Sequence, residues 1–505
     1  MNEVQKIVLA VDLGTTSTRT LAVSGQGEVL ASHSVRYPLY TPKPGYAEQD
    51  PKQIYEACVT TIAAVMEQGD WQADDVLCVT FSSANHSLIA IDEAGQPLTP
   101  SITWADQRSA EQAKAMLEHG IGLDIYKRTG TPIHPMSPLV KLVWLKEKEP
   151  QLFAEAHQFI GIKEYIFLQL FGTPWMDYSI ASATGMFNLE KLEWDKEAVD
   201  WLGLNMAQLP PLVPTTFKVT GLKEEIAEQM HLSTTTPFVL GAQDGVLANL
   251  GIGALEDGVV AVTIGTSSAV RACTNKPTFD EEGRLFCYAL TEGYWLVGGS
   301  SNNGAIVAEW AAEQWFNGES LSEILPRLSE ISPGADGLLF MPLLSGERAP
   351  FWDAEAKGVM FGLTLAHTKQ HMMRAALEGV LFQLLAIVSM MEEKGTVAKQ
   401  IRASGGFARS PLWCQMMADM LGVAVFVPDV VESSGLGAAQ LGIYAMNNEQ
   451  GKLCIWDNMS GTTYEPDSNN HRIYRQLLPT YLQLYYSLKD AMSHMTVLQQ
   501  TTLSV

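Results

Sequence analysis

The chain has few cysteines, and they are scattered. Its 505 residues include six, and no two of them form a CxxC pair. They are Cys58, Cys78, Cys273, Cys287, Cys414 and Cys454. A disulfide framework or a structural zinc site needs closely placed cysteines, so this usage argues against both. Isolated thiols are typical of a protein kept in a reducing compartment, and we therefore expect a cytoplasmic location.

Positive charge is also scarce. Lys and Arg together number 33 against 56 Asp and Glu, which gives a formal net charge of −23. Surfaces that bind nucleic acid or anionic membranes are rich in positive charge, so neither partner is expected. An anionic small molecule would need donor groups placed locally at its site.

Three further signals are missing. No apolar run approaches the roughly 18 residues of a membrane helix, and the best candidate, LFQLLAIVSMM (381–391), contains Gln383. The start, MNEVQKIVLAVD, has an early acidic residue and no long apolar stretch, so we expect no signal peptide. The pattern GxxxxGK[ST] does not occur, which argues against a P-loop nucleotide site.

What the chain does contain is a hairpin of small hydroxylated residues. The apolar run IVLAV (7–11) predicts a buried strand, and VDLGTTSTR (11–19) then turns into a second strand, TLAV (20–23). A glycine lets the backbone approach a ligand, and successive N–H groups and hydroxyls can surround an anion. An adjacent Asp12 suits a hydrated Mg²⁺ that accompanies phosphates. The alternative is an ordinary hairpin turn, which favours the same residues.

A second copy of this pattern lies half a chain away. VTIGTSS (262–268) repeats the Val, Gly, Thr and Ser of VDLGTTS (11–17) in the same places, with Thr263 where Asp12 stands. Two related phosphate hairpins indicate two similar domains that close on one nucleotide. Only the first would hold the metal.

The order of elements supports two domains. Strand patterns alternate with helix patterns, which is typical of an α/β protein, and 505 residues suffice for two large cores. The clearest helix is predicted over 371–394, and a final helix over 472–494. A buried strand in PFVLGAQDG (237–245) ends at Asp244. We place the domain boundary near residue 250, which gives domains 1–250 and 251–505.

Three longer motifs, in order, resemble those of the FGGY carbohydrate kinases of the actin/hexokinase-type ATPase superfamily. PLVKLVWL (138–145) and GVMFGLTLAHTKQHMMRAALEG (358–379) are similar to the two family signatures, and SGGFARSPLWCQMMAD (404–419) is similar to the adenosine-binding turn and helix. The resemblance implies two duplicated ribonuclease H-like ATPase domains with a cleft between them. The N-terminal domain would take the sugar and the Mg²⁺–phosphate side, and the C-terminal domain would take the nucleotide.

The resemblance also implies residue roles. Asp244 would be the general base, with helix capping as the alternative role, and Asp12 would hold Mg²⁺. ATP would contact Thr15, Thr16, Ser17, Arg19, Gly265, Thr266, Gly304, Gly405 and Gly406. The acceptor would contact Asn85, His86, Trp104, Asp106 and Met136. The alternatives are a surface arginine at Arg19, a tight turn at Gly405–Gly406, a structural histidine at His86, and an ion pair between Asp106 and Arg108.

Within the family, the sequence is most similar to those of the bacterial gluconate kinases. The stretches that carry this are SSANHS (82–87), ITWADQRS (102–109), YKRTGTPIHPM (126–136), IGIKEYIF (160–167) and DYSIASATGM (177–186). The resemblance implies ATP-dependent phosphorylation of D-gluconate to 6-phospho-D-gluconate by a homodimer.

Other acceptors and another protein class stay open. The chain departs from the glycerol kinases, which carry Arg-Glu at Asn85–His86 and Tyr at Met136. A kinase for xylulose or another polyol remains the near alternative, and a chaperone- or filament-type ATPase of the same superfamily is the distant one. The donors for a gluconate carboxylate could come from Asn85, His86, Arg108 or Lys141, which the sequence does not rank.

Overall fold

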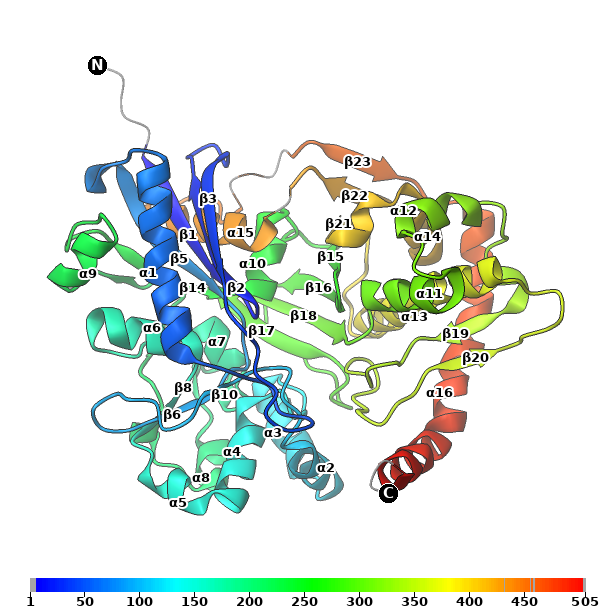
Figure 1. Cartoon of the computed structure of the whole chain (residues 1–505), viewed down its shortest axis with the longest axis horizontal. Helices are drawn as coiled ribbons and strands as arrows, with labels where there is room; N and C mark the ends of the chain where they lie inside the picture. The colour runs from blue at the N-terminus through cyan, green and yellow to red at the C-terminus, as the bar shows by residue number, and fades with distance from the viewer. Residues whose placement is uncertain (1–5, 431, 455, 457–458, 503–505) are drawn as a thin grey trace. The chain divides into compact units, whose positions relative to one another are not determined.

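The computed structural model describes residues 6–430, 432–454, 456 and 459–502. The chain forms two compact units, whose helices and strands are drawn in Figure 1. The first contains Met1–Leu255, Thr274–Leu296 and Glu432–Asn458, and the second contains Glu256–Cys273, Val297–Val431 and Met459–Val505. Two stretches from the second half of the sequence are therefore part of the N-terminal unit.

The first unit is built on a sheet of six strands in the order β13-β14-β5-β1-β2-β3. Strand β5 is parallel to both β1 and β14, whereas β2 is antiparallel to β1 and β13 is antiparallel to β14. All residues of β1 except Asp12 are buried, as expected of a parallel strand covered on both faces. The bounds are β1 (Ile7–Leu13), β2 (Ser17–Val23), β3 (Val29–Arg36), β5 (Val76–Ser83), β13 (Lys218–Val219) and β14 (Phe238–Gln243).

The second unit repeats this arrangement in the series β16-β15-β21-β22-β23. Strand β21 is parallel to β15 and to β22, while β16 and β23 are antiparallel to their neighbours. The orientations match those of β2-β1-β5-β14-β13 one by one, so the prediction of a duplicated α/β fold is confirmed. The bounds are β15 (Val259–Ile264), β16 (Ser268–Thr274), β21 (Gln400–Ser404), β22 (Val425–Pro428) and β23 (Gly461–Tyr464).

Helix ends follow local sequence signals. Asp50 caps helix α1 (Pro51–Gln68) by accepting from the amide of Lys52 at 2.9 Å, and Pro51 occupies the first helical position. Ser410 caps α14 (Pro411–Leu421) in the same way, and Gly422 ends that helix in the left-handed region. These short-range contacts explain why both helices begin where a proline follows a polar residue.

Beyond the strands already given, the two units contain further helices and strands. Those of the first unit are β4 (Glu48–Gln49), β6 (Ile89–Ile91), β7 (Ser101–Ile102), α2 (Ala110–Glu118), α3 (Ile121–Thr129), α4 (Pro138–Lys148), α5 (Pro150–Glu155), β8 (Gln158–Ile160), α6 (Ile162–Phe171), β9 (Met176–Asp177), α7 (Tyr178–Ser182), β10 (Phe187–Asn188), β11 (Glu193–Trp194), α8 (Lys196–Leu202), β12 (Leu212–Val213), α9 (Glu224–Gln229), α10 (Asp244–Gly251), β17 (Phe286–Thr291) and α15 (Ser433–Met446). Strand β18 (Tyr294–Ser301) leads from the first unit into the second, which adds α11 (Ala305–Phe316), α12 (Leu321–Ile324), β19 (Leu339–Met341), β20 (Val359–Phe361), α13 (Lys369–Glu393) and α16 (Ser468–Thr502).

Helix α15 packs against α10 and against the sheet strands β1 and β5 (Figure 1). Two glycines make the helix–helix approach close. A Cβ at Gly251 would lie 1.7 Å from the carbonyl oxygen of Ser433, and one at Gly437 would lie 1.9 Å from that of Leu247. The small residues of SSGLGAAQLG (433–442) therefore bring the N-terminus of α15 to the end of β1.

Helix α13 is long and apolar enough to span a membrane, which the short run 381–391 did not predict. Within the described part of the chain it is the one helix that meets this test. Some 89% of its most apolar window is buried inside the fold, so its apolar surface is used as core.

Candidate active site

Asp12 lies at the end of β1, where the parallel strands of the first unit present their carboxyl ends. Ser82 of β5 donates from Oγ to Asp12 Oδ1 at 2.6 Å, and Ser434 of α15 donates to Oδ2 at 3.0 Å. Burial raises the pKa of Asp12 above its ordinary value, and these hydrogen bonds oppose the rise. Each carboxylate oxygen has capacity for a further partner, so the hydroxyls orient the group without saturating it.

Asp244 is the first residue of α10 and comes from the same sheet edge. The register pairs Asp12 with Ser82 and Ser82 with Ala242, two residues before Asp244, so the two aspartates lie at the carboxyl ends of β1 and β14, the strands on either side of β5. Gln243 holds the capping position, and the amide of Gly245 donates to Asp244 Oδ1 at 2.6 Å. A helix N-terminus favours the ionised carboxylate, which is the form a general base needs.

The turn between β1 and β2 is braced from one side. The indole N–H of Trp104 donates to Thr15 Oγ1 at 2.8 Å, and Gln49 donates to the carbonyl oxygen of Thr15 at 2.6 Å. Thr16 is exposed and Ser17 is half-buried. The predicted phosphate residues therefore form a turn that is fixed at Thr15 and open to solvent at Thr16.

Arg19 also lies on this hairpin, and it forms an ion pair with Glu432, the residue before α15. Its side chain is 40% exposed. A bound phosphate would therefore have to compete with Glu432 for this guanidinium.

Asn85 and Trp104 come together with Thr15 around a small cavity of about 10 Å³. That volume is about the size of one water molecule. Gln49 and Thr103 also line it. Two segments predicted for the acceptor side, 82–87 and 102–109, thus meet the phosphate turn.

Asn85 is linked to the neighbour of Asp244. Its amide donates to Gln243 Oε1 at 2.5 Å, and Gln243 Nε2 donates to the carbonyl oxygen of Ser179 at 3.1 Å. Ser179 lies on the short helix α7, within the small-residue stretch 177–186. This chain of contacts joins the predicted acceptor residue Asn85 to the start of α10.

His86 and Met136 are both buried. His86 has φ of 63°, an unusual value for a residue with a side chain, and its Nε2 lies 3.4 Å from the hydroxyl of Tyr288. Met136 is only 2% exposed. Their predicted contacts with an acceptor remain predictions.

Asp106 is engaged within the protein. It accepts from Arg108 at 2.8 and 2.9 Å and from the amide of Ala47 at 2.7 Å, and its side chain is fully buried. Arg108 also donates to Glu48 at 2.5 Å. This geometry matches the alternative of an ion pair, and the predicted substrate contact of Asp106 stays untested.

Of the four candidate donors for a carboxylate, Lys141 is also engaged. Its fully buried ammonium donates to three backbone carbonyls, and burial lowers its pKa to about 7. Arg108 is likewise engaged, by the carboxylates of Asp106 and Glu48.

The second unit gathers the predicted nucleotide glycines around the β15–β16 turn. The amide of Gly304 donates to the carbonyl oxygen of Thr266 at 3.1 Å, and a Cβ at Gly304 would lie 2.5 Å from that of Gly265. Gly405 has φ of 101°, and a Cβ there would lie 2.4 Å from the carbonyl oxygen of Ile264. Both glycines are therefore required by close backbone packing around the turn.

Gly406 borders a cavity of about 660 Å³ that lies wholly in the second unit. A Cβ at Gly406 would meet open space. The volume is typical of sites for ligands of nucleoside size. Its other lining residues are Ala305, Glu309, Leu321, Ser322, Leu325, Pro326, Phe407, Arg409, Ser410, Pro411, Leu412 and Trp413.

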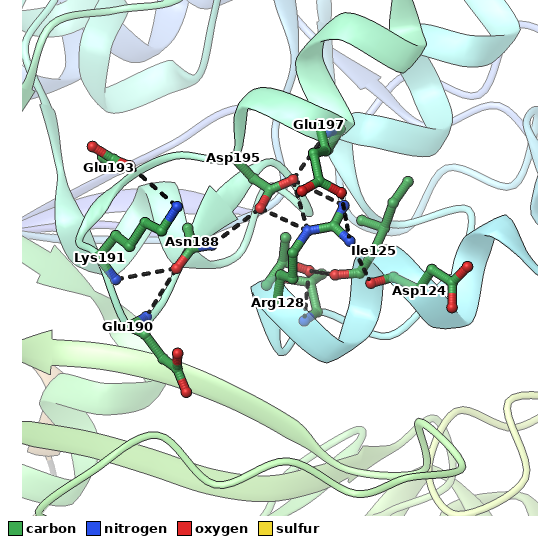
Figure 2. Close-up of polar contacts among 12 residues, drawn as sticks. Asp124, Ile125, Arg128, Asn188, Glu190, Lys191, Glu193, Asp195 and Glu197 are labelled. Carbon is green, nitrogen blue, oxygen red and sulfur yellow. Dashed lines mark hydrogen bonds and ion pairs between the residues drawn. The ribbon is translucent and has the colours of Figure 1, made fainter.

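A polar cluster fixes the start of the segment that carries Met136 (Figure 2). Arg128, in the last turn of α3, donates from Nε and Nη2 to the carboxylate of Asp195 at 2.9 to 3.1 Å. Asn188 Nδ2 donates to the same carboxylate at 3.1 Å, and Asp195 caps α8 through the amide of Ala198 at 2.9 Å. The cluster ties α3 to α8 immediately before the 130–137 segment.

Several residues of the site were not predicted. Ser82 lies in the stretch SSANHS and Gln243 lies in GAQDG, and both stretches contain predicted site residues. Closeness in sequence to a predicted residue could therefore have identified them. The other residues are distant in sequence from their partners, and no local sequence pattern identifies them as site residues. They are Gln49, Tyr288 and Ser434.

The chain is similar to known proteins over most of its length. Residues 7–251 match the N-terminal domain of the FGGY family of carbohydrate kinases, and residues 260–446 match its C-terminal domain. Gluconokinase from Bacillus subtilis (strain 168) is 46% identical over 500 residues, with 96% of each chain covered. The structure of gluconate kinase from Lactobacillus acidophilus has a TM-score of 0.92 at 34% identity, covering 96% of this chain and 98% of its own. That of ligand-bound xylulose kinase from the same organism has a TM-score of 0.94 at 34% identity, covering 97% and 100%. The chain belongs to the FGGY family of carbohydrate kinases.

Proposed function

We propose that this carbohydrate kinase transfers the γ-phosphoryl group of ATP to D-gluconate and forms 6-phospho-D-gluconate. The observation that carries the proposal is the 46% identity to a gluconokinase over 96% of both chains. The solved gluconate kinase and xylulose kinase structures are equally similar to the chain, at 34% identity each, so the choice of the sugar acid rests on the 46% match. A cytoplasmic homodimer is part of the same proposal.

The residues present fit Mg²⁺ and ATP. Mg²⁺ is usually held by one or two carboxylates, with water and substrate phosphates completing its shell. Asp12 offers one oriented carboxylate, and no group of three His, Cys, Asp or Glu side chains forms a metal cage within the described residues. When bound, the ion would neutralise charge on the phosphates. The 660 Å³ cavity beside Gly406 suits the nucleoside.

The chain's own groups then supply positioning and proton transfer. The acceptor oxygen forms a bond to the γ-phosphorus, the bond from that phosphorus to the bridging oxygen breaks, and ADP leaves. The hydroxyl proton passes to the carboxylate of Asp244, which stands at the start of α10, and a helix N-terminus favours the ionised form that accepts a proton. Thr15, Thr16 and Ser17 contact phosphate from the first hairpin, and Gly265 and Thr266 from the second.

A coupled ADP-release assay tests the proposal. Wild type is measured with Mg·ATP and D-gluconate, D-xylulose, L-ribulose, glycerol or no acceptor. We expect turnover with gluconate, and a loss of about 10³-fold or more in Asp244→Asn. Asp200→Asn, the same change on an exposed residue of α8, should retain wild-type turnover.

The outcomes separate the parts of the proposal. Turnover with a neutral acceptor in place of gluconate would reject the substrate. Turnover that survives Asp244→Asn would reject the base. Turnover without any acceptor would reject acceptor phosphorylation as the main activity.

A further inference from the structure

Lys141 joins three segments that are far apart in the sequence. The side chain comes from helix α4 and is fully buried. Its Nζ donates to the carbonyl oxygens of His86 at 2.5 Å, Met136 at 2.8 Å and Ile102 at 3.4 Å. An ammonium group has three N–H donors, so these three carbonyls match its full capacity.

Each of these segments carries a residue proposed for the acceptor. His86 follows Asn85 in the β5–β6 turn, Ile102 ends β7 just before Trp104, and Met136 lies in the segment that leads into α4. One side chain therefore fixes the spacing of three segments whose relative position defines the predicted acceptor site.

Burying the Lys141 side chain has a cost in free energy, which suggests that the position serves a purpose. Removing an ammonium from water is unfavourable, and Asp106, whose charge opposes the lowering of the pKa of Lys141, is already paired with Arg108. Charge-assisted hydrogen bonds to carbonyls offset part of that cost and hold the backbone more firmly than neutral ones. Apolar packing could stabilise α4 without a buried charge, but it would not set the separation of three carbonyl oxygens.

We propose that Lys141 is a positioning residue that holds the three acceptor segments in register, so that its loss weakens acceptor binding far more than ATP binding. The inference rests on the acceptor site proposed above. It assigns Lys141 no contact with the acceptor, since its donors are taken up by the backbone.

The test compares Lys141→Met with Lys146→Met. Both residues lie on α4, and Lys146 donates to a single carbonyl outside the acceptor segments, that of Leu202 at 2.7 Å. The acceptor is whichever compound of the panel wild type phosphorylates best. We expect Lys141→Met to raise the KM for that acceptor by about tenfold or more while the KM for ATP changes less than about twofold. Lys146→Met should leave both constants near wild type.

A second variant guards against a folding defect. Lys141→Gln keeps two N–H donors at a shorter reach, and its acceptor KM should lie between those of wild type and Lys141→Met. Equal rises in both KM values, or a fall in kcat alone, would overturn the proposal, as would folded variants with wild-type acceptor KM.

Asn85→Ala separates the two hypotheses. If it raises the acceptor KM while the Lys141 variants do not, the acceptor site stands and the role of Lys141 fails. If Asn85→Ala has no effect on that KM, the acceptor site itself is misplaced and the inference falls with it.

Discussion

Glu164 shows how one buried carboxyl group can give the fold a pH dependence. It lies in the first turn of α6, fully buried, and accepts from the amide of Gly161 at 2.9 Å. Burial raises its pKa from 4.5 to about 7, against the opposing charge of Lys163, which is ion-paired with Asp177 at 2.5 Å. The folded protein therefore binds this proton over a pH range in which the unfolded chain has released it.

We predict that the free energy of unfolding falls as pH rises from about 4.5 to about 7, by about 3 kcal/mol at most from this group. The full contribution is present below the unfolded pKa and is lost as pH passes the folded value. Glu164→Gln should flatten the profile over that interval, measured by urea unfolding at several pH values. Glu155→Gln, at an exposed carboxyl on α5, should keep the wild-type slope. An unchanged slope in Glu164→Gln would contradict the prediction.

Gly304 gives a prediction for the nucleotide side. A Cβ at this position would lie 2.5 Å from the carbonyl oxygens of both Gly265 and Ser267, so Gly304→Ala must displace the β15–β16 turn. We expect the KM for ATP to rise by about tenfold or more, with less than about twofold change in the acceptor KM. Gly25→Ala, where a Cβ meets open space, is the control. A wild-type KM for ATP in Gly304→Ala would show that the turn does not bind phosphate.

At the scale of elements, the polar cluster that joins α3 to α8 should stabilise the folded protein. Asp195 is nearly buried and accepts from Arg128, Asn188 and the amide of Ala198 (Figure 2). These contacts lower the pKa of Asp195, so their stabilising effect is present at neutral pH and is lost as pH falls below its ordinary range. We expect Asp195→Asn to reduce the free energy of unfolding by about 1–3 kcal/mol at pH 7.

Chemical denaturation measures that change, and Glu197→Gln supplies its control. Glu197 contacts the same arginine at 3.3 Å but is 77% exposed, so solvent screens the pair. Its loss should change stability by less than about 0.5 kcal/mol. Equal effects of the two substitutions would mean that Asp195 acts only through general surface charge.

Strands and turns that follow from patterns of neighbouring residues could be predicted from the sequence. Contacts between elements that are far apart in the sequence could not. The hairpin at Asp12 and the strand ending at Asp244 follow from apolar runs and small turn residues that are adjacent in the chain. Ser434 reaches Asp12 across 422 positions because glycines let α15 approach α10. No local sequence pattern states what this helix packs against.

For the molecule as a whole, the two units share one strand arrangement, but only the first carries an aspartate, Asp12, at its hairpin. Both units use the same strand orientations and the same hairpin, but Thr263 stands where the first unit has Asp12, and it hydrogen-bonds Ser404 at 3.0 Å. The repeat VTIGTSS made this asymmetry visible in the sequence. The ion pair of Asp106 with Arg108 was an open alternative there, whereas the ion pair of Arg19 with Glu432 was not predicted, because sequence spacing does not show which partner a charged side chain meets.

The net charge of −23 leads to the last prediction. An anionic acceptor is repelled by a protein of this charge, and two cations near the proposed acceptor site, Arg108 and Lys141, are held by carboxylates or backbone carbonyls. Salt shortens the range of that repulsion to about 10 Å at 0.1 M. We therefore expect kcat/KM for D-gluconate at saturating Mg·ATP to rise by about two- to threefold between about 0.01 M and 0.1 M salt.

A neutral acceptor that the enzyme turns over, even slowly, should show no such rise, which separates repulsion of the acceptor from effects of salt on ATP. If kcat/KM for gluconate falls with salt instead, a local cation must outweigh the net charge, and the carboxylate would then be bound by an ionic contact rather than by an uncharged donor such as the Asn85 amide.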